Sequence, residues 1–432
     1  MTTASNSSRN RKLIRNRKPR APYRLQLESL ESRMLLATFV VNSTGDEPDV
    51  TPGNGICETV ASGGVCTLRA AIQETNVLAN NPVGTPDEIH FSIGGAGVHT
   101  ISPTSALPTI IQPVIIDGYT QGSATPDPAD DAMPNTDPNG FNGTLLIVLN
   151  GANAGGVNGL TITADNSTVR GLVINGFLRA GTANGQGIVL RGSGNRIEGN
   201  LIGTNAAGTM AVTNEGHGID IDGPSGNNHT IGGTTPAARN IISGNTFTGI
   251  RVSERSGIVI QGNFIGTQRD GKSPLGNGVN GVGYEFNVST GSGNQIGGTA
   301  VGAGNVIAHN GGIGVRLQEG MTQTSILGNS IFSNGALGID LNPLGGSATG
   351  VTPNDPGDPD GGANNLQNFP IITGITASGG TTTIQGKLNS TANTTYRVEL
   401  FDNVAGDPSG NGEGQLFLGA VPGGVMTDAA GN

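Results

Sequence analysis

A short phrase recurs along this chain: glycine, an apolar residue, any residue, and a second apolar residue. It begins at Gly187, Gly218, Gly249, Gly281, Gly312 and Gly338. The successive offsets are 31, 31, 32, 31 and 26 residues. One short strand and its turns in each unit of about 30 residues is typical of a solenoid whose coils stack on one another. The repeat therefore predicts the architecture more directly than it predicts an activity.

A longer repeat lies over the short one. Residues 231–245 (IGGTTPAARNIISGN) return as residues 296–310 (IGGTAVGAGNVIAHN), and residues 199–209 return as residues 262–272. Two types of coil therefore alternate, with insertions after Gly-Thr in one and after Gly-Gly-Thr in the other. In each coil the two apolar residues of the phrase are expected to point inward, because alternate residues of a strand face opposite sides. This pattern predicts an all-β fold, a right-handed parallel β-helix.

Asparagines follow a small residue at equivalent strand ends. They are Asn200, Asn245, Asn263, Asn310 and Asn329. Asparagine tolerates a left-handed backbone, and its amide can bond to a stacked counterpart in the next coil. We interpret them as turn residues rather than ligand-binding residues.

The composition excludes several classes of protein. The 432 residues include 74 glycines and no tryptophan, yet there is no Gly-X-Y period and aliphatic residues are regularly spaced, which argues against collagen and against disorder. No apolar run approaches the roughly 18 residues of a membrane span. Nine of the 22 basic residues lie in the first 33, and residues 34–432 hold 13 basic and 30 acidic residues. An acidic body with dispersed cations is a poor partner for nucleic acid, and the basic head is interpreted as a disordered or targeting segment.

The two cysteines, Cys57 and Cys66, flank a glycine-rich stretch that can turn back on itself. Such a close pair predicts one disulfide and an oxidising, extracellular compartment. Two unpaired buried thiols are the alternative. Thr67 follows directly and can cap a helix over residues 68–76, with Gln73 and Glu74 on its solvent side. A helix at this point would cover the first edge of the β-stack.

Two segments resemble parts of known bacterial surface proteins. The first resembles the Leu-Glu-Pro-Arg-x-Leu-Leu motif near the N-terminus of very large surface proteins, and it matches at Leu30, Glu31, Arg33, Leu35 and Leu36, with Ser32 in place of proline. This resemblance implies export. The second, residues 66–76, is similar to the Cys-Ser-Leu-Arg-Glu-Ala domain of surface β-helix proteins, and the matching residues are Cys57, Cys66, Leu68 and Arg69. It implies a bacterial surface β-helix and says little about chemistry.

The repeat stops after Leu341. Residues 346–368 are rich in Gly, Pro, Asp and Asn, which is typical of a linker. Alternating stretches follow at residues 371–377, 381–388, 396–401 and 416–421, and they predict part of a small Ig-like β-sandwich. The expected domains are a basic head (1–37), the β-helix with its capping helix (38–345), the linker (346–368) and the partial sandwich (369–432). The chain ends in a turn-like sequence, so we expect it to be part of a longer, multidomain protein.

One cluster of residues could support acid–base chemistry. His217, Asp220, Asp222, Arg251 and Glu254 are expected to lie within two neighbouring coils, where carboxylates and a histidine could act on a sugar. The segments around Gly216 to Gly218 and Gly249 to Val252 resemble fragments of the polygalacturonase pattern, but the order of that family's other motifs is reversed here. A solvated cross-strand pair of Asp220 and Arg251 is the structural alternative.

Two acidic loops are candidate calcium sites. Asp355, Asp358 and Asp360 lie in one loop, and the other contains Asp127, Asp130, Asp131 and Asp137. Calcium prefers several oxygen ligands on a flexible loop. A solvated linker is the alternative, and calcium is the one cofactor that the sequence suggests.

The sequence thus predicts an extracellular structural or adhesive β-helix module of a bacterial cell-surface protein. Its expected partner is cell-surface or extracellular polysaccharide, with neither nucleic acid nor a transmembrane segment involved. The alternative is a polysaccharide lyase or glycoside hydrolase of the β-helix class. An acidic body with dispersed basic residues argues against a uronate lyase, whose groove should be basic.

Overall fold

A computed structural model describes residues 1–2, 37–59, 64–78, 80, 85–122, 131–181, 185–223, 226–253, 255–284, 291–343, 350–406 and 410–432. All elements below belong to the compact unit Leu36–Asn432. Residues 3–36, which include most of the basic head and its export-like motif, lie outside the described residues, as do Asp127, Asp130 and Glu254.

Three parallel sheets form the body of this unit. The first sheet has nine strands, in the spatial order β1 (Thr38–Val41), β2 (Asp87–Phe91), β4 (Val114–Asp117), β7 (Thr168–Arg170), β10 (Arg196–Glu198), β13 (Thr230–Gly232), β16 (Val259–Gln261), β19 (Gln295–Gly297) and β22 (Ser325–Leu327). The second has eight, β3 (His99–Ile101), β5 (Ile147–Asn150), β8 (Leu172–Asn175), β11 (Leu201–Ile202), β14 (Ile241–Ile242), β17 (Phe264–Ile265), β20 (Val306–Ala308) and β23 (Ser330–Phe332). The third has seven, β6 (Leu160–Ile162), β9 (Ile188–Leu190), β12 (Ile219–Ile221), β15 (Ile250–Val252), β18 (Val282–Tyr284), β21 (Val315–Leu317) and β24 (Ile339–Leu341).

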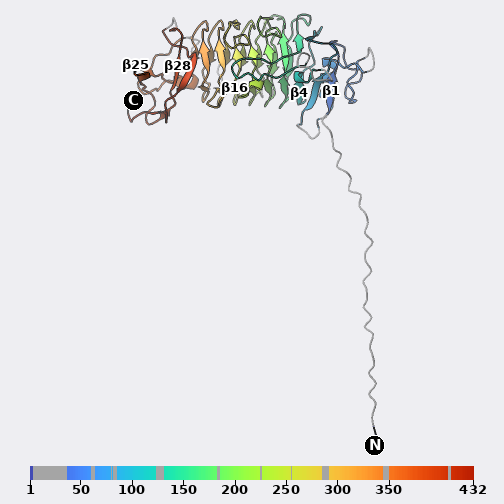
Figure 1. Cartoon of the computed structure of the whole chain (residues 1–432), viewed down its shortest axis with the longest axis horizontal. Coiled ribbons are helices and arrows are strands. Elements are labelled where there is room, and N and C mark those ends of the chain that lie inside the picture. Colours follow the sequence, from blue (N-terminus) through green and yellow to red (C-terminus); the bar gives the residue numbers. More distant parts are fainter. Residues whose placement is uncertain are drawn as a thin grey trace. The chain divides into compact units, whose positions relative to one another are not determined.

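Each strand pairs with the strand one coil later in the chain. Ile219 lies opposite Ile250, for example, and Ile250 lies opposite Val282. The coils follow one another in chain order from β1 through β4 to β16 (Figure 1). This is a parallel β-helix, as the sequence predicts.

Aliphatic stacks fill the interior. Ile188, Ile219, Ile250 and Val282 occupy the same register position in successive coils, and all four are fully buried. Burying a side chain of this size contributes about 1.5–3 kcal/mol, so each coil adds its own share to a core that is continuous from β1 onward.

The glycine of the repeated phrase is required by the close stacking of coils, not by its backbone conformation. A Cβ on Gly249 would lie 2.8 Å from the carbonyl oxygen of Gly281 in the next coil, and φ of Gly249 is not positive. The structure also corrects one register. In the fifth unit the strand begins at Val315, and the glycine that faces the next coil is Gly314 rather than Gly312, since a Cβ there would lie 2.6 Å from the Gly338 oxygen.

At these strand ends, the residue with a left-handed backbone conformation is the one directly before the asparagine. φ is 74° at Gly244, 60° at His309 and 54° at Ser333, and the asparagines that follow these residues are not in the left-handed region. The prediction that asparagine itself adopts this conformation is therefore wrong. The preceding residue, which is glycine, histidine or serine in these three cases, makes the turn, and the asparagine side chain bonds along the stack.

Helix α1 (Leu68–Val77) is the α-helix of the described chain, and Thr67 caps it by accepting a hydrogen bond from the Ala70 N–H at 3.1 Å. Glu74 does not face solvent as predicted, because the loop before the helix covers it. Its carboxylate is fully buried and accepts from the N–H groups of Gly53 at 3.0 Å and Gly55 at 3.3 Å. Burial raises the pKa of Glu74, and the backbone donors act in the opposite direction.

The C-terminal strands pair antiparallel, as the sequence predicts. The pairs are β25 (Ile371–Ser378) with β26 (Thr381–Lys387), β27 (Thr395–Tyr396) with β30 (Val425–Met426), and β28 (Glu399–Asp402) with β29 (Leu416–Ala420). Short 3-10 helices are η1 (Gly118–Thr120), η2 (Pro236–Ala238) and η3 (Ala363–Leu366). Among the described residues, no helix is long and apolar enough to cross a membrane.

Candidate functional site

The predicted acid–base residues lie on the outer face of the seven-stranded sheet. Asp220 on β12 is in register with Arg251 on β15, with Val189 of β9 on one side and Gly283 of β18 on the other. The Arg251 Nη1 atom lies 2.9 Å from both carboxylate oxygens of Asp220. The structure therefore forms the cross-strand pair of the alternative interpretation, but the pair is not solvated as that interpretation expected.

This pair is buried although it lies on the outer face. The side chains of Asp220 and Arg251 are 3% and 12% exposed. Burial raises the pKa of Asp220 to about 6, and the Arg251 charge acts against this rise. A carboxyl group that protonates the leaving group has to touch the glycosidic oxygen of its substrate, and the enclosed side chain of Asp220 does not offer that contact in this structure.

His217 lies one residue before the phrase of the same coil. Its Nδ1 accepts a hydrogen bond from the Thr248 N–H at 3.2 Å, and its ring lies 5.6 Å from that of Phe247. Burial, with the nearby charge of Arg251 as the second cause, lowers the pKa of His217 to about 3. The imidazole is therefore neutral at pH 7, and its basic nitrogen is already bonded to the backbone.

Asp222 follows Asp220 on the same face and belongs to a second ion pair. Arg191 Nε donates to its Oδ1 at 2.8 Å. Asp220 and Asp222 thus each form an ion pair with an arginine of a neighbouring coil. Of the predicted cluster, the structure brings His217, Asp220, Asp222 and Arg251 together within adjacent coils, and Glu254 lies outside the described residues.

A more accessible polar surface lies on the nine-stranded sheet, and the sequence analysis missed it. Arg170 on β7 lies 2.6 Å from Asp117 on β4, and Arg196 on β10 lies 2.8 Å from Glu198 of the same strand. The two arginine side chains are 42% and 49% exposed. We call these four residues the Arg170–Arg196 face. Alternation within the short strands could have indicated it, because Arg170 and Arg196 each lie beside a buried aliphatic residue.

The structure gathers Asp355, Asp358 and Asp360, and carboxylate oxygens of the three lie within 4.8 Å of one another. Asp358 also accepts from the Asn368 N–H at 3.1 Å and from the Ser390 hydroxyl. Burial and the charges of the two neighbouring carboxylates raise the pKa of Asp360. Oxygen ligands of this kind suit calcium, and the site stays a prediction.

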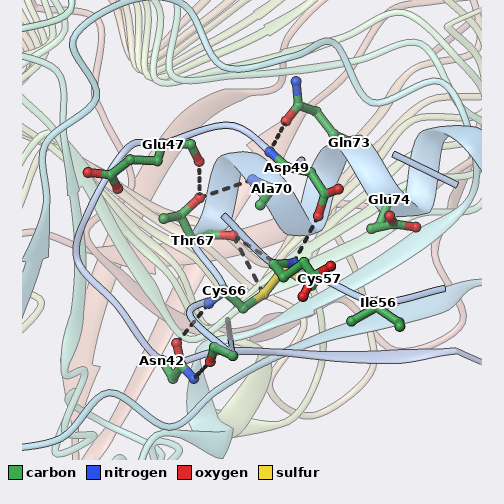
Figure 2. The surroundings of a disulfide bond; sticks show 12 residues. Asn42, Glu47, Asp49, Ile56, Cys57, Cys66, Thr67, Ala70, Gln73 and Glu74 are labelled. Carbon is green, nitrogen blue, oxygen red and sulfur yellow. Dashed lines mark hydrogen bonds between the residues drawn. A yellow bond between two sulfur atoms is a disulfide. The ribbon is translucent and has the colours of Figure 1, made fainter. Parts of the chain in front are cut away.

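Cys57 and Cys66 form the predicted disulfide, with their Cα atoms 5.2 Å apart. Figure 2 shows the bond beside the start of α1, where Thr67 donates its hydroxyl to the Glu47 carbonyl at 2.7 Å. Asn42, just after β1, fixes the second cysteine, because its side-chain oxygen accepts from the Cys66 N–H at 2.9 Å. The disulfide thus closes the loop directly before α1, and Asn42 connects that loop to the end of the first strand.

Two ladders of asparagines, all but Asn334 buried, run along the stack, one before and one after the eight-stranded sheet. In each, a side-chain amide donates to the side-chain oxygen of the asparagine one coil later. The first contains Asn200, Asn240, Asn263, Asn305 and Asn329. The second contains Asn214, Asn245, Asn277, Asn310 and Asn334. The prediction that asparagines bond to stacked counterparts is correct, but it found half of the members and treated two ladders as one.

Comparisons with known proteins give little further help. The chain matches no protein family and no curated protein. Among solved structures, the Dettilon tailspike protein is similar with 14% identity over 80% of this chain and 82% of that chain, at a TM-score of 0.33. The ORF18 protein of Geobacillus virus E2 has 14% identity over 89% of this chain and 75% of that chain, at a TM-score of 0.29. Since both scores are low, the assignment of the fold rests on the strand pairing described above.

Proposed function

We propose that this chain is an extracellular, structural and adhesive β-helix module of a bacterial cell-surface protein, with polysaccharide as its partner. The observation that carries the proposal is the enclosure of Asp220 in its ion pair with Arg251, which removes the candidate acid–base group from contact with a polymer. The disulfide supports an oxidising compartment. The resemblance of residues 30–36 and 66–76 to surface proteins supports the location.

The Arg170–Arg196 face is the surface that we assign to polysaccharide. Its guanidinium and carboxylate groups are held in fixed positions by their ion pairs, and their remaining donors and acceptors can bond to sugar hydroxyls. Because residues 34–432 are strongly acidic, we expect a neutral glycan rather than a polyanion.

The test is glycan-array binding by the full chain. The wild-type protein should bind at least one neutral glycan, and a variant with both Arg170→Ala and Arg196→Ala should lose that binding. Lys272→Ala, which removes an exposed positive charge elsewhere, should bind as the wild type does. Failure of the wild type to bind any glycan, or equal binding by the double variant, contradicts the proposal.

A second function, hydrolysis or lyase cleavage of polysaccharide, is favoured by one observation. The pKa of Asp220 is raised to about 6 close to Asp222 and His217, and perturbed carboxylates cluster at active sites. Sugar release by the wild type that is lost in Asp220→Asn and in Asp222→Asn would establish this function. Release that is unchanged in both variants would remove these residues from it.

A further inference from the structure

The last coil of the β-helix is formed by β22, β23 and β24, and no further coil pairs with it among the residues that the structure describes. Exposed strand edges of this kind present backbone donors and acceptors to any other chain. In this protein a short segment that lies between β28 and β29 contacts the exposed edge of β23. We call this segment, residues 413–415 together with Glu399, the plug.

Glu413 takes the place of the next asparagine in the second ladder. Asn245, Asn277 and Asn310 each donate from Nδ2 to the following asparagine Oδ1 at 2.9 Å. Asn334 is the last member, and its Nδ2 donates to Oε1 of Glu413 at 3.0 Å. The Asn334 backbone N–H also points to this oxygen, at 3.4 Å, as the Asn310 N–H points to Asn334 Oδ1 at 3.2 Å. A carboxylate oxygen thus replaces an amide oxygen at the end of the stack.

Glu413 also covers the last glycine of the repeat. A Cβ on Gly314 would meet the carbonyl oxygen of Gly338 one coil later, at 2.6 Å. A Cβ on Gly338 would instead meet the Glu413 Cγ atom at 3.1 Å. One side chain therefore substitutes for both the asparagine and the glycine that another coil would supply.

The plug pairs with the edge strand β23 through its backbone. The Ile331 N–H donates to the Gly414 carbonyl at 2.8 Å in an antiparallel bridge, and the Ser330 hydroxyl donates to the Gln415 carbonyl. Asn403 holds the segment in place, since its Nδ2 donates to the Glu413 carbonyl at 2.6 Å and its oxygen accepts from the Gln415 N–H at 2.8 Å.

Glu399 accepts a hydrogen bond from the backbone of the last coil, close to the end of the first ladder. Its Oε2 accepts from the Gly328 N–H at 2.8 Å, directly before the last asparagine of the first ladder, and Arg397 binds its Oε1 at 2.8 Å. The second ladder therefore ends at a carboxylate of the C-terminal segment, and a second carboxylate binds the backbone directly before the last asparagine of the first ladder.

We propose that the plug is an end cap that keeps the last coil from pairing with a second copy of this chain. The edge of β23 accepts an antiparallel segment in this structure. Two copies related by a twofold axis would present the same edge to each other in the antiparallel sense, which is the usual geometry of a symmetric dimer. With the plug detached, β23 of a second copy is the occupant that fits.

The test compares two double variants of the full chain. Glu399→Ala with Glu413→Ala removes both acceptors, whereas Glu399→Gln with Glu413→Gln keeps a side-chain oxygen at each position. In the alanine pair, hydrogen exchange of the amides of residues 328–341 should rise at least about tenfold, with no change at β11, and sedimentation should show a concentration-dependent dimer. The glutamine pair should resemble the wild type in both measurements.

Three outcomes overturn the proposal. Unchanged exchange in the alanine pair shows that the carboxylates do not hold the plug. Equal changes in the alanine and glutamine pairs show that loss of the acceptor is not the cause. Faster exchange without a dimer at any concentration shows that the plug does not prevent self-association. If the alanine pair does not fold, Glu413→Ala alone is compared with Glu413→Gln by the same two measurements.

Discussion

The asparagine ladders should contribute a large part of the stability of the stack, and Asn277 in the middle of the second ladder is the residue to test. Its side chain is fully enclosed, with 1% exposure. It donates to Asn310 Oδ1 and to the Ile242 carbonyl, both at 2.9 Å. It accepts from the Nδ2 and the backbone N–H of Asn245, at 2.9 and 3.2 Å.

Asn277→Ala removes all four of these hydrogen bonds, and the alanine side chain offers no group that could replace the lost amide. A hydrogen bond contributes about 1 kcal/mol net, and a buried partner left unpaired costs more than this mean. We therefore expect the free energy of unfolding to fall by about 4 kcal/mol. Asn277→Asp keeps the shape but loses the donor, and it places an acceptor beside the Asn310 oxygen, so a loss of similar size is expected at pH 7.

The assay is urea unfolding followed by circular dichroism, with hydrogen exchange at β14 and β15 to locate the change. The matched control is Asn139→Ala, because Asn139 is exposed and its replacement should change the free energy by less than about 0.5 kcal/mol. A loss below about 1 kcal/mol in Asn277→Ala, or equal losses in the two alanine variants, would refute the role of the ladder.

Three further predictions follow from buried or crowded groups. Burial lowers the pKa of His217 to about 3 and of His229 to about 4 from 6.5, so the unfolded chain binds more protons below pH 6.5 and stability should fall as pH falls. Between pH 7 and pH 5 the two histidines cost about 3.7 kcal/mol, and the raised pKa of Asp220 returns about 1.3 kcal/mol. The net loss of about 2.4 kcal/mol is measured by urea titrations at the two pH values, and equal stability contradicts it. Tyr284 is fully buried and its hydroxyl has no partner among the described residues, so Tyr284→Phe should raise the free energy of unfolding by about 1–2 kcal/mol, and a loss of stability shows that the hydroxyl is bonded. The pKa of Asp360 is raised beside two carboxylates, so Asp360→Asn should raise the melting temperature at pH 7 in the presence of chelator, whereas added calcium should raise that of the wild type more; no response to calcium removes the predicted site.

The sequence predicts the parts of this fold that depend on neighbouring coils, because the same contact recurs in each coil. The repeated glycine can be recognised in the sequence because every coil needs it: a Cβ at Gly249, for example, would clash with the next coil. The two apolar positions can be recognised because each side chain packs on the side chain at the same position of the next coil. The register of the fifth unit was misread because Gly312 and Gly314 both begin a matching phrase, and only the strand pairing decides between them.

The parts that escaped prediction depend on contacts without a repeat. Glu74 lies on the polar side of the helix sequence, and only the loop folded over it shows that it is buried. Glu413 lies 79 residues from Asn334, its partner in the ladder, and no periodicity connects the two. The pairing of Asp220 with Arg251 was anticipated as an alternative, but the enclosure of that pair could not be read from the sequence.

The central proposal is that the β-helix acts as a binding scaffold, and it rests on Asp220, whose side chain is enclosed in its ion pair with Arg251. The most direct test is to incubate the folded full chain with a panel of neutral and acidic polysaccharides and to follow the molar mass of each polymer by light scattering. The expected result is no change in molar mass for any polysaccharide. A fall in the molar mass of one polymer that Asp220→Asn abolishes would contradict the claim.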